Sequence, residues 1–229
     1  MITRYLFVKP ILICILILRC YFSVAQDKAP ELPKLSVRAN VGIPKIASSK
    51  QFRNSFSGVI TADANVNYKL FSNYFVGIGY SYTYYKCQKY FRDPLRDNIN
   101  TNLQTHNEYV KLGYDKFFST NGFATFSINT GYSSSAYASI RYKNDSLIGK
   151  YPTTYANAFI EPMIGLYFIV DPNFAIGGHL SYNYNFAQFN PLYPQFNEWG
   201  PPGYVGLSNK WDMSLITLGF GFYYGFAKK

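Results

Sequence analysis

The C-terminal segment of the chain, Asp212 to Phe226, alternates between two kinds of side chain. One parity is large and apolar: Ile216, Leu218, Phe220, Phe222, Tyr224 and Phe226. The other parity is small or polar: Thr217, Gly219, Gly221, Tyr223 and Gly225. Because successive side chains of a strand point to opposite faces, this pattern predicts a strand with lipid on one side and a tight interior on the other. The segment is therefore predicted to be a transmembrane β-strand.

The N-terminus has the pattern of a secretory signal peptide. Arg4 and Lys9 precede an apolar run at 11–18, and Ala25 ends a small-residue motif of the kind that signal peptidases read. The apolar run is shorter than the roughly 20 residues that a transmembrane helix needs. The expected organisation is a signal peptide at 1–25, a periplasmic segment at 26–34 and a barrel domain at 35–229.

Composition supports a membrane barrel rather than a helical membrane protein. Aromatic residues make up 20% of the chain and charged residues 15%, yet beyond the signal peptide no apolar run is long enough to span as a helix. Alternation along strands accounts for this combination. Cys87 is the one cysteine left after cleavage, so no intramolecular disulfide is expected. The positive charge is dispersed, which argues against a nucleic-acid partner.

About eight segments show the alternating pattern, a number within the range of transmembrane barrels. The predicted strands are 35–43, 58–70, 74–87, 108–117, 123–142, 155–170, 174–186 and 212–226. Pro162 is a flaw in the sixth, because proline cannot donate to a ladder. Short connections (70–73, 116–122, 171–173) alternate with long ones (44–57, 88–105, 143–154, 187–211). Since outer-membrane barrels put short turns in the periplasm, both termini are expected there.

The alternating strands, the inward glycines and the closing aromatic strand Gly219-Phe-Gly-Phe-Tyr-Tyr-Gly-Phe226 resemble the small outer-membrane β-barrel family, similar to the OmpA transmembrane domain and the OmpX type. The resemblance covers nearly the whole mature chain. It implies an all-β, antiparallel up-and-down barrel in the bacterial outer membrane. Members of this family include structural anchors, adhesins, small pores and a few lipid-modifying enzymes, so the resemblance implies a location more than an activity.

About eight strands leave room for side chains but not for a wide channel. The residues predicted to form an interior polar network are Arg38, Asp63, Lys111, Glu161 and His179. Closing the first hairpin between Ile43 and Gly58 places Arg38 opposite Asp63, which predicts a salt bridge between them. An ion or proton path is the alternative interpretation of these charges.

One spacing resembles a catalytic device. His179 and Ser181 are two residues apart and share a face of a strand. Lipid A deacylases of the outer membrane place a His and a Ser with this spacing on the barrel wall, and Glu161 is a candidate third group. By parity, however, His179 and Ser181 point inward, away from the lipid. The same residues are therefore interpreted first as interior network and filler.

The tyrosines Tyr80, Tyr82, Tyr84 and Tyr85 fit an aromatic girdle at the membrane interface, with a sugar-binding patch as the alternative. With two His and one mature Cys, the sequence predicts no metal site, and it predicts no cofactor.

The favoured function is a monomeric, non-enzymatic barrel with a filled interior that acts in envelope structure or surface interaction. Its expected neighbours are outer-membrane lipid and lipopolysaccharide, with envelope or surface proteins reached through loops 88–105 and 187–211. The alternatives are a lipid A deacylase-like hydrolase and a narrow pore.

Overall fold

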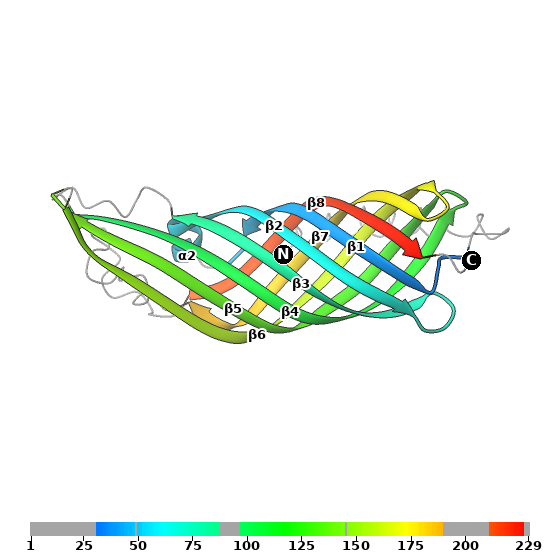
Figure 1. Ribbon diagram of the computed structural model, residues 1–229, viewed down its shortest axis with the longest axis horizontal. Coiled ribbons are helices and arrows are strands. Elements are labelled where there is room, and N and C mark those ends of the chain that lie inside the picture. The colour runs from blue at the N-terminus through cyan, green and yellow to red at the C-terminus, as the bar shows by residue number, and fades with distance from the viewer. Residues whose placement is uncertain (1–30, 49, 88–96, 145, 190–210, 227–229) are drawn as a thin grey trace, which may run out of the picture.

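The computed structural model describes residues 31–48, 50–87, 97–144, 146–189 and 211–226. Its eight strands form one closed barrel in which each strand pairs antiparallel with its neighbours in the chain and β8 closes on β1 (Figure 1). The elements are β1 (Leu35–Ile46), α2 (Lys50–Ser55), β2 (Phe56–Lys69), β3 (Tyr74–Cys87), β4 (Asp97–Ser119), β5 (Gly122–Lys143), β6 (Ser146–Asp171), β7 (Phe174–Phe189) and β8 (Trp211–Phe226). The predicted up-and-down barrel is confirmed.

Two strands begin well before the predicted position. β4 begins at Asp97 and β6 at Ser146, so much of the expected loops 88–105 and 143–154 is strand. Figure 1 shows β4, β5 and β6 continuing together beyond the other strands as a projecting sheet. The short turns lie at the opposite end of the barrel, called here the short-turn end. The predicted signal peptide and most of loop 187–211 lie outside the described residues.

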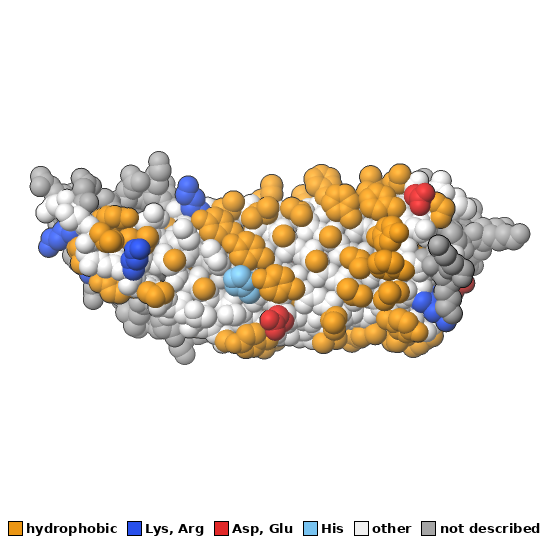
Figure 2. Space-filling view, viewed as in Figure 1, with side chains coloured by type: hydrophobic (Ala, Val, Ile, Leu, Met, Phe, Trp, Pro, Cys, Tyr) orange, Lys and Arg blue, Asp and Glu red, His pale blue; other side chains and the backbone are white. Residues whose placement is uncertain are grey.

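Around the short-turn half of the barrel, apolar side chains face out and polar side chains face in. Leu218 and Phe220 on β8 are 67% and 76% exposed, whereas Thr217, which precedes Leu218, is 3% exposed. Figure 2 shows hydrophobic side chains covering this half as a belt. None of the helices among the described residues is long and apolar enough to cross a membrane. The belt is the surface that a bilayer would cover.

Pro162 fits into β6 without breaking the barrel. It lies opposite Ile128 in the ladder with β5, while on the β7 side the paired residues jump from Ile160 to Met163. The missing N–H therefore falls on the β7 side. The local defect does not end the strand.

In the projecting half the polarity of β4 is partly reversed, although polar side chains such as Thr101 and Ser135 are also buried inside. Leu103 of β4 points inward and is fully buried, whereas Asn100 and Gln104 are exposed on the outside. The buried outer cluster that Leu103 joins consists of Ile46, Phe52, Phe56, Tyr85, Leu103, Tyr137, Met213 and Leu215. Phe52 belongs to α2, so this short helix contributes to the packing at the outer end. The outer face of β4 in this half is polar, as expected for a strand that faces water.

A second apolar cluster lies inside the short-turn end. Phe123 and Tyr167 stack there with ring centroids 5.2 Å apart, and Tyr223 meets Phe123 edge-on at 5.5 Å. Leu32, from the segment before β1, and Ala175 complete this inner cluster. The barrel interior thus consists of a polar layer between two apolar clusters.

Candidate functional site: the interior polar layer

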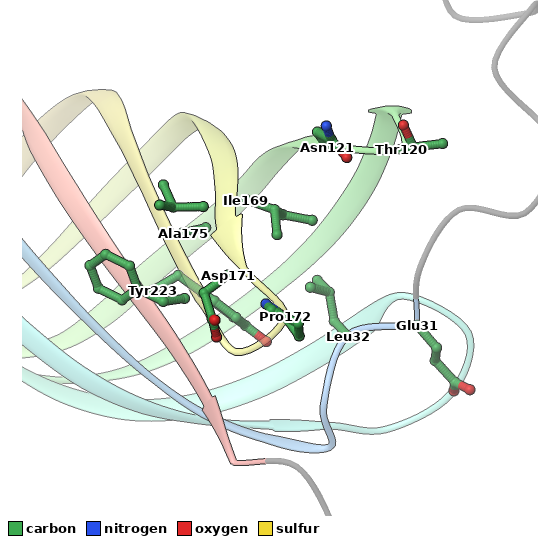
Figure 3. Close-up of a pocket in the computed structure, with 11 residues that line it drawn as sticks. Glu31, Leu32, Thr120, Asn121, Ile169, Asp171, Pro172, Ala175 and Tyr223 are labelled. Atoms are coloured by element: carbon green, nitrogen blue, oxygen red, sulfur yellow. The ribbon is translucent and has the colours of Figure 1, made fainter.

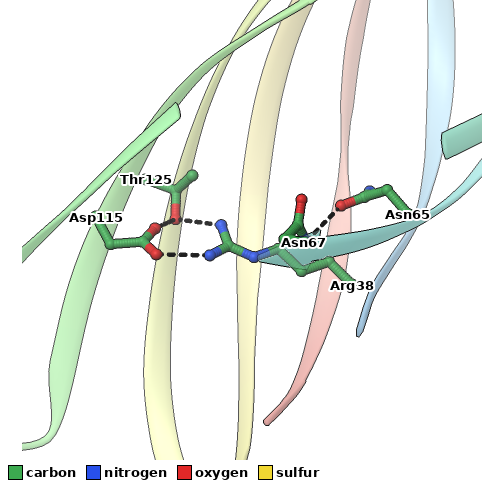
Figure 4. A network of polar contacts seen from close by, with 5 residues as sticks. All are labelled: Arg38, Asn65, Asn67, Asp115 and Thr125. Atoms are coloured by element: carbon green, nitrogen blue, oxygen red, sulfur yellow. Dashed lines mark hydrogen bonds and ion pairs between the residues drawn. The ribbon is translucent and has the colours of Figure 1, made fainter. Parts of the chain in front are cut away.

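At the short-turn end of the polar layer, Arg38 of β1 reaches across the barrel to Asp115 of β4. Its Nη2 donates to Asp115 Oδ2 at 2.6 Å and its Nη1 to Thr125 Oγ1 at 2.9 Å, while Thr125 donates to Asp115 Oδ1 at 2.6 Å (Figure 4). The guanidinium carbon lies 4.3 Å from the ring centroid of Phe75 and 5.2 Å from that of Tyr223. Arg38 is 1% exposed, so the charge is enclosed by its ion pair and by aromatic rings.

The predicted pair between Arg38 and Asp63 is therefore wrong. In the ladder, Arg38 lies opposite Asn65, and Asp63 lies opposite Asn40. β1 continues to Ile46 and α2 occupies part of the connection, so the hairpin closes two residues away from the predicted register. A shift of two residues keeps every side chain on its face but changes every partner.

Asp63 is instead the centre of a hydrogen-bonded group in the middle of the barrel. It accepts from Asn40 Nδ2 at 2.6 Å, from Asn65 Nδ2 at 2.9 Å and from the hydroxyl of Tyr109. Asn67 extends the group by donating to Asn65 at 2.8 Å (Figure 4). Tyr109 and β1 thus hold the carboxylate from opposite sides, which satisfies a charge that would be costly to bury alone.

The other predicted interior residues, Lys111, Glu161 and His179, also lie on the inner face. Lys111 is fully buried, and its Nζ has no hydrogen-bond partner among the described residues. Glu161 accepts from Asn129 at 3.4 Å. The interior layer of the described barrel holds Arg38 and Lys111 against three carboxylates, those of Asp63, Asp115 and Glu161. Attraction between these opposite charges in a narrow space offsets part of the cost of burying each of them.

The candidate catalytic residues His179, Ser181 and Glu161 line one small interior cavity of about 10 Å³. His179 and Ser181 share a face as predicted, and they are 6% and 4% exposed. A space of that size holds about one water molecule and no acyl chain. The arrangement is a polar packing contact inside the barrel, with no opening to the lipid face. Among the described residues no group of His, Cys, Asp and Glu has the arrangement of a metal site.

A larger cavity of about 480 Å³ opens at the short-turn end. Figure 3 shows Glu31, Leu32, Asp171 and Tyr223 around it. Leu32 and Tyr223 also line a second space of about 10 Å³, which touches Arg38 and Asp115 and holds about one water molecule. The space between this cavity and the polar layer is therefore narrow.

Among the network members that were not predicted as site residues are Asp115, Thr125 and Tyr109. Asp115 has the inward parity of Lys111, and Tyr109 precedes Lys111 by two residues, so alternation places both inside. Their roles could not be predicted, because Arg38 and Asp115 meet across the barrel, far apart in the ladder.

Solved structures share this architecture, although no protein-family model matches the chain and no curated protein matches it significantly in sequence. A major outer membrane protein from Thermus thermophilus is 11% identical, with a TM-score of 0.54 over 85% of this chain and 99% of the other. Neisserial surface protein A is 15% identical (TM-score 0.48; 86% and 100% covered), and the Escherichia coli outer membrane protease OmpT is 10% identical (TM-score 0.47; 85% and 94% covered). The predicted resemblance to small outer-membrane barrels is confirmed at the level of the fold.

Proposed function

We propose that this outer-membrane β-barrel protein acts in surface interaction through its projecting end, with a closed interior. By the rule that short turns lie in the periplasm, the projecting sheet of β4, β5 and β6 faces outward from the cell and both termini face the periplasm. The barrel wall is then surrounded by outer-membrane lipid and lipopolysaccharide, and the barrel acts as a monomer.

The edge that β6 turns away from β5 in the projecting sheet is the observation that carries this proposal. The ladder of β6 with β7 ends at Phe159 and Asn185, and residues 146–154 and 156–158 of β6 have no β7 partner among the described residues. A strand edge that extends past its ladder offers a row of N–H and C=O groups to an added strand. Pro152 and Lys150 are features that limit uncontrolled pairing on such an edge. The edge therefore fits a selective protein partner that adds a strand.

Pro152 also indicates which residues of β6 turn their N–H groups to the edge away from β5. It lies opposite Ala138 in the continuous ladder with β5, where it donates no hydrogen bond. Alternate residues of an antiparallel strand turn their N–H groups to opposite edges. The even-numbered residues of β6 therefore turn their N–H groups to the edge away from β5. Thr154 and Ala156 are thus the positions at which proline would block an added strand and spare the ladder with β5.

The test compares the purified wild-type barrel with a double variant, Thr154→Pro and Ala156→Pro. A Thr154→Val and Ala156→Val variant, which keeps both N–H groups, is the matched control. Each is immobilised in detergent and exposed to a native envelope extract, and captured proteins are identified by mass spectrometry. We expect a protein that wild type and the valine control capture and the proline variant loses. Identical capture by all three heat-modifiable barrels would refute edge-strand docking.

The two alternatives have less support. A hydrolase that uses His179 and Ser181 would need these buried side chains to meet a lipid ester from inside the barrel. A pore would need passage through both apolar clusters, and planar-bilayer recordings are expected to show no steady conductance. Regular single-channel steps from the purified barrel would favour the pore instead.

A further inference from the structure

An acidic side chain faces outward in the apolar belt. Glu108 on β4 is exposed, with the lipid-facing residues Val110 and Leu112 next on the same face toward the short-turn end. In the ladder it lies between Tyr80 of β3 and Tyr132 of β5, which are 45% and 54% exposed on the same outer face.

A second polar row lies one step toward the projecting end. His106 follows Glu108 on the same face, opposite Tyr82 on one side and Ser134 on the other. The hydroxyl of Tyr80 and His106 Nδ1 form a hydrogen bond of 2.5 Å, and the Tyr82 ring centroid is 5.2 Å from that of His106. The imidazole is thus held in place by two tyrosines.

Glu108 is an ionisable residue on the membrane-facing wall. A carboxylate there costs less near the interface than at the bilayer midplane, but ionisable residues in membrane-spanning segments usually serve a function. No salt bridge from a described basic residue reaches Glu108. The tyrosines place it at the level of the aromatic girdle, where lipid headgroups lie.

We propose that the outward row of Glu108, Tyr80 and Tyr132 binds the ammonium group of a zwitterionic phosphoethanolamine lipid. A carboxylate beside tyrosine rings combines an ionic acceptor with aromatic faces, and this is the chemistry that recognises an ammonium. His106 and Ser134 present donors to the adjacent phosphate. Because barrel strands tilt by roughly 35–45°, the step from Glu108 to His106 runs sideways as much as upward, which suits a headgroup lying along the surface.

This site depends only on the barrel being in a membrane. It shares no residue with the interior layer or with the edge of β6 away from β5. Failure of edge-strand docking would therefore leave it standing, and loss of lipid binding would leave the docking proposal intact.

The test uses the full mature barrel in nanodiscs that contain equal parts of phosphatidylethanolamine and phosphatidylglycerol. Lipid retained after transfer to mild detergent is counted by native mass spectrometry. Wild type is expected to retain phosphatidylethanolamine preferentially, and Glu108→Gln is expected to reduce that preference at least about fivefold. Glu31→Gln, the same change at an exposed site of the short-turn end, should retain it. N-acetylated phosphatidylethanolamine, which lacks the ammonium, should not be retained by wild type.

Equal preference in wild type and Glu108→Gln would overturn the proposal, as would retention of the N-acetylated lipid. Dimerisation of wild type that Glu108→Gln abolishes, with no lipid preference, would assign the carboxylate to a second copy of the chain and also overturn it. Should Glu108→Gln fail to give a heat-modifiable barrel, Tyr132→Leu keeps an apolar outer face and removes one ring. That variant is expected to bind the lipid more weakly, and unchanged binding would count against the site.

Discussion

The membrane half and the projecting half of this barrel are built from the same strands, but the polarity of β4 differs between them. On β4, Leu112 faces outward and Lys111 inward in the membrane half, whereas Gln104 faces outward and Leu103 inward in the projecting half. The strand geometry does not change between the halves, but the solvent around the wall does. Lipid requires an apolar outside and tolerates a satisfied polar inside, while water requires the reverse. The position where polarity switches along a strand therefore marks the membrane boundary.

The ion pair at the short-turn end gives the largest expected effect in the membrane half. Asp115→Leu leaves the Arg38 charge buried and unpaired, which should lower the free energy of unfolding by about 3–5 kcal/mol. Adding Arg38→Met should restore most of that stability, since both charges are then gone. Urea unfolding of barrels in lipid vesicles measures the cycle. Arg38→Met combined with Asp63→Leu should show much weaker coupling, and additivity between positions 38 and 115 would mean that the pair does not form.

The second prediction compares two leucines of β4 that face opposite ways. Leu103→Ala opens a cavity in the outer cluster and should cost about 2–5 kcal/mol. Leu112→Ala on the lipid face should cost much less, because lipid chains fill the space and are as apolar as leucine. Both are measured by the same unfolding transition. Equal costs would mean that the projecting half has no packed core.

The third prediction concerns charge on the outer face. Leu218→Arg or Phe220→Arg should cost roughly 2–4 kcal/mol if these residues lie near the bilayer midplane. Ala138→Arg, which is also outward but in the projecting half, should cost little. Folding yield into vesicles and the unfolding midpoint report the difference. Equal tolerance at the two levels would place the membrane boundary elsewhere.

Alternation along the chain predicted all eight strands and the face of each predicted network residue, because the two faces of a membrane barrel differ so strongly. The projecting part of β4 was not predicted, although Ile99, Thr101 and Leu103 alternate with asparagines there. Its apolar side chain Leu103 faces inward, which is opposite to the pattern of the membrane half. The partners inside the barrel were harder to predict. Arg38 and Asp115 lie on strands that do not pair, so neither hairpin register nor spacing brings them together.

The smallest expected effect tests how tightly the membrane half is filled. Gly79 points inward, and a Cβ there would lie 2.5 Å from the Tyr109 ring and 2.7 Å from Asn65 Cβ. Gly178 points outward, and the nearest atom to its Cβ would be 3.6 Å away. Gly79→Val should therefore cost about 1–3 kcal/mol through overpacking, while Gly178→Val should be nearly neutral. Because Tyr109 also donates to Asp63, displacing its ring would disturb the central hydrogen bonds as well. If Gly79→Val unfolded at the same urea concentration as wild type, the interior would have free space, and a narrow solute path would regain support.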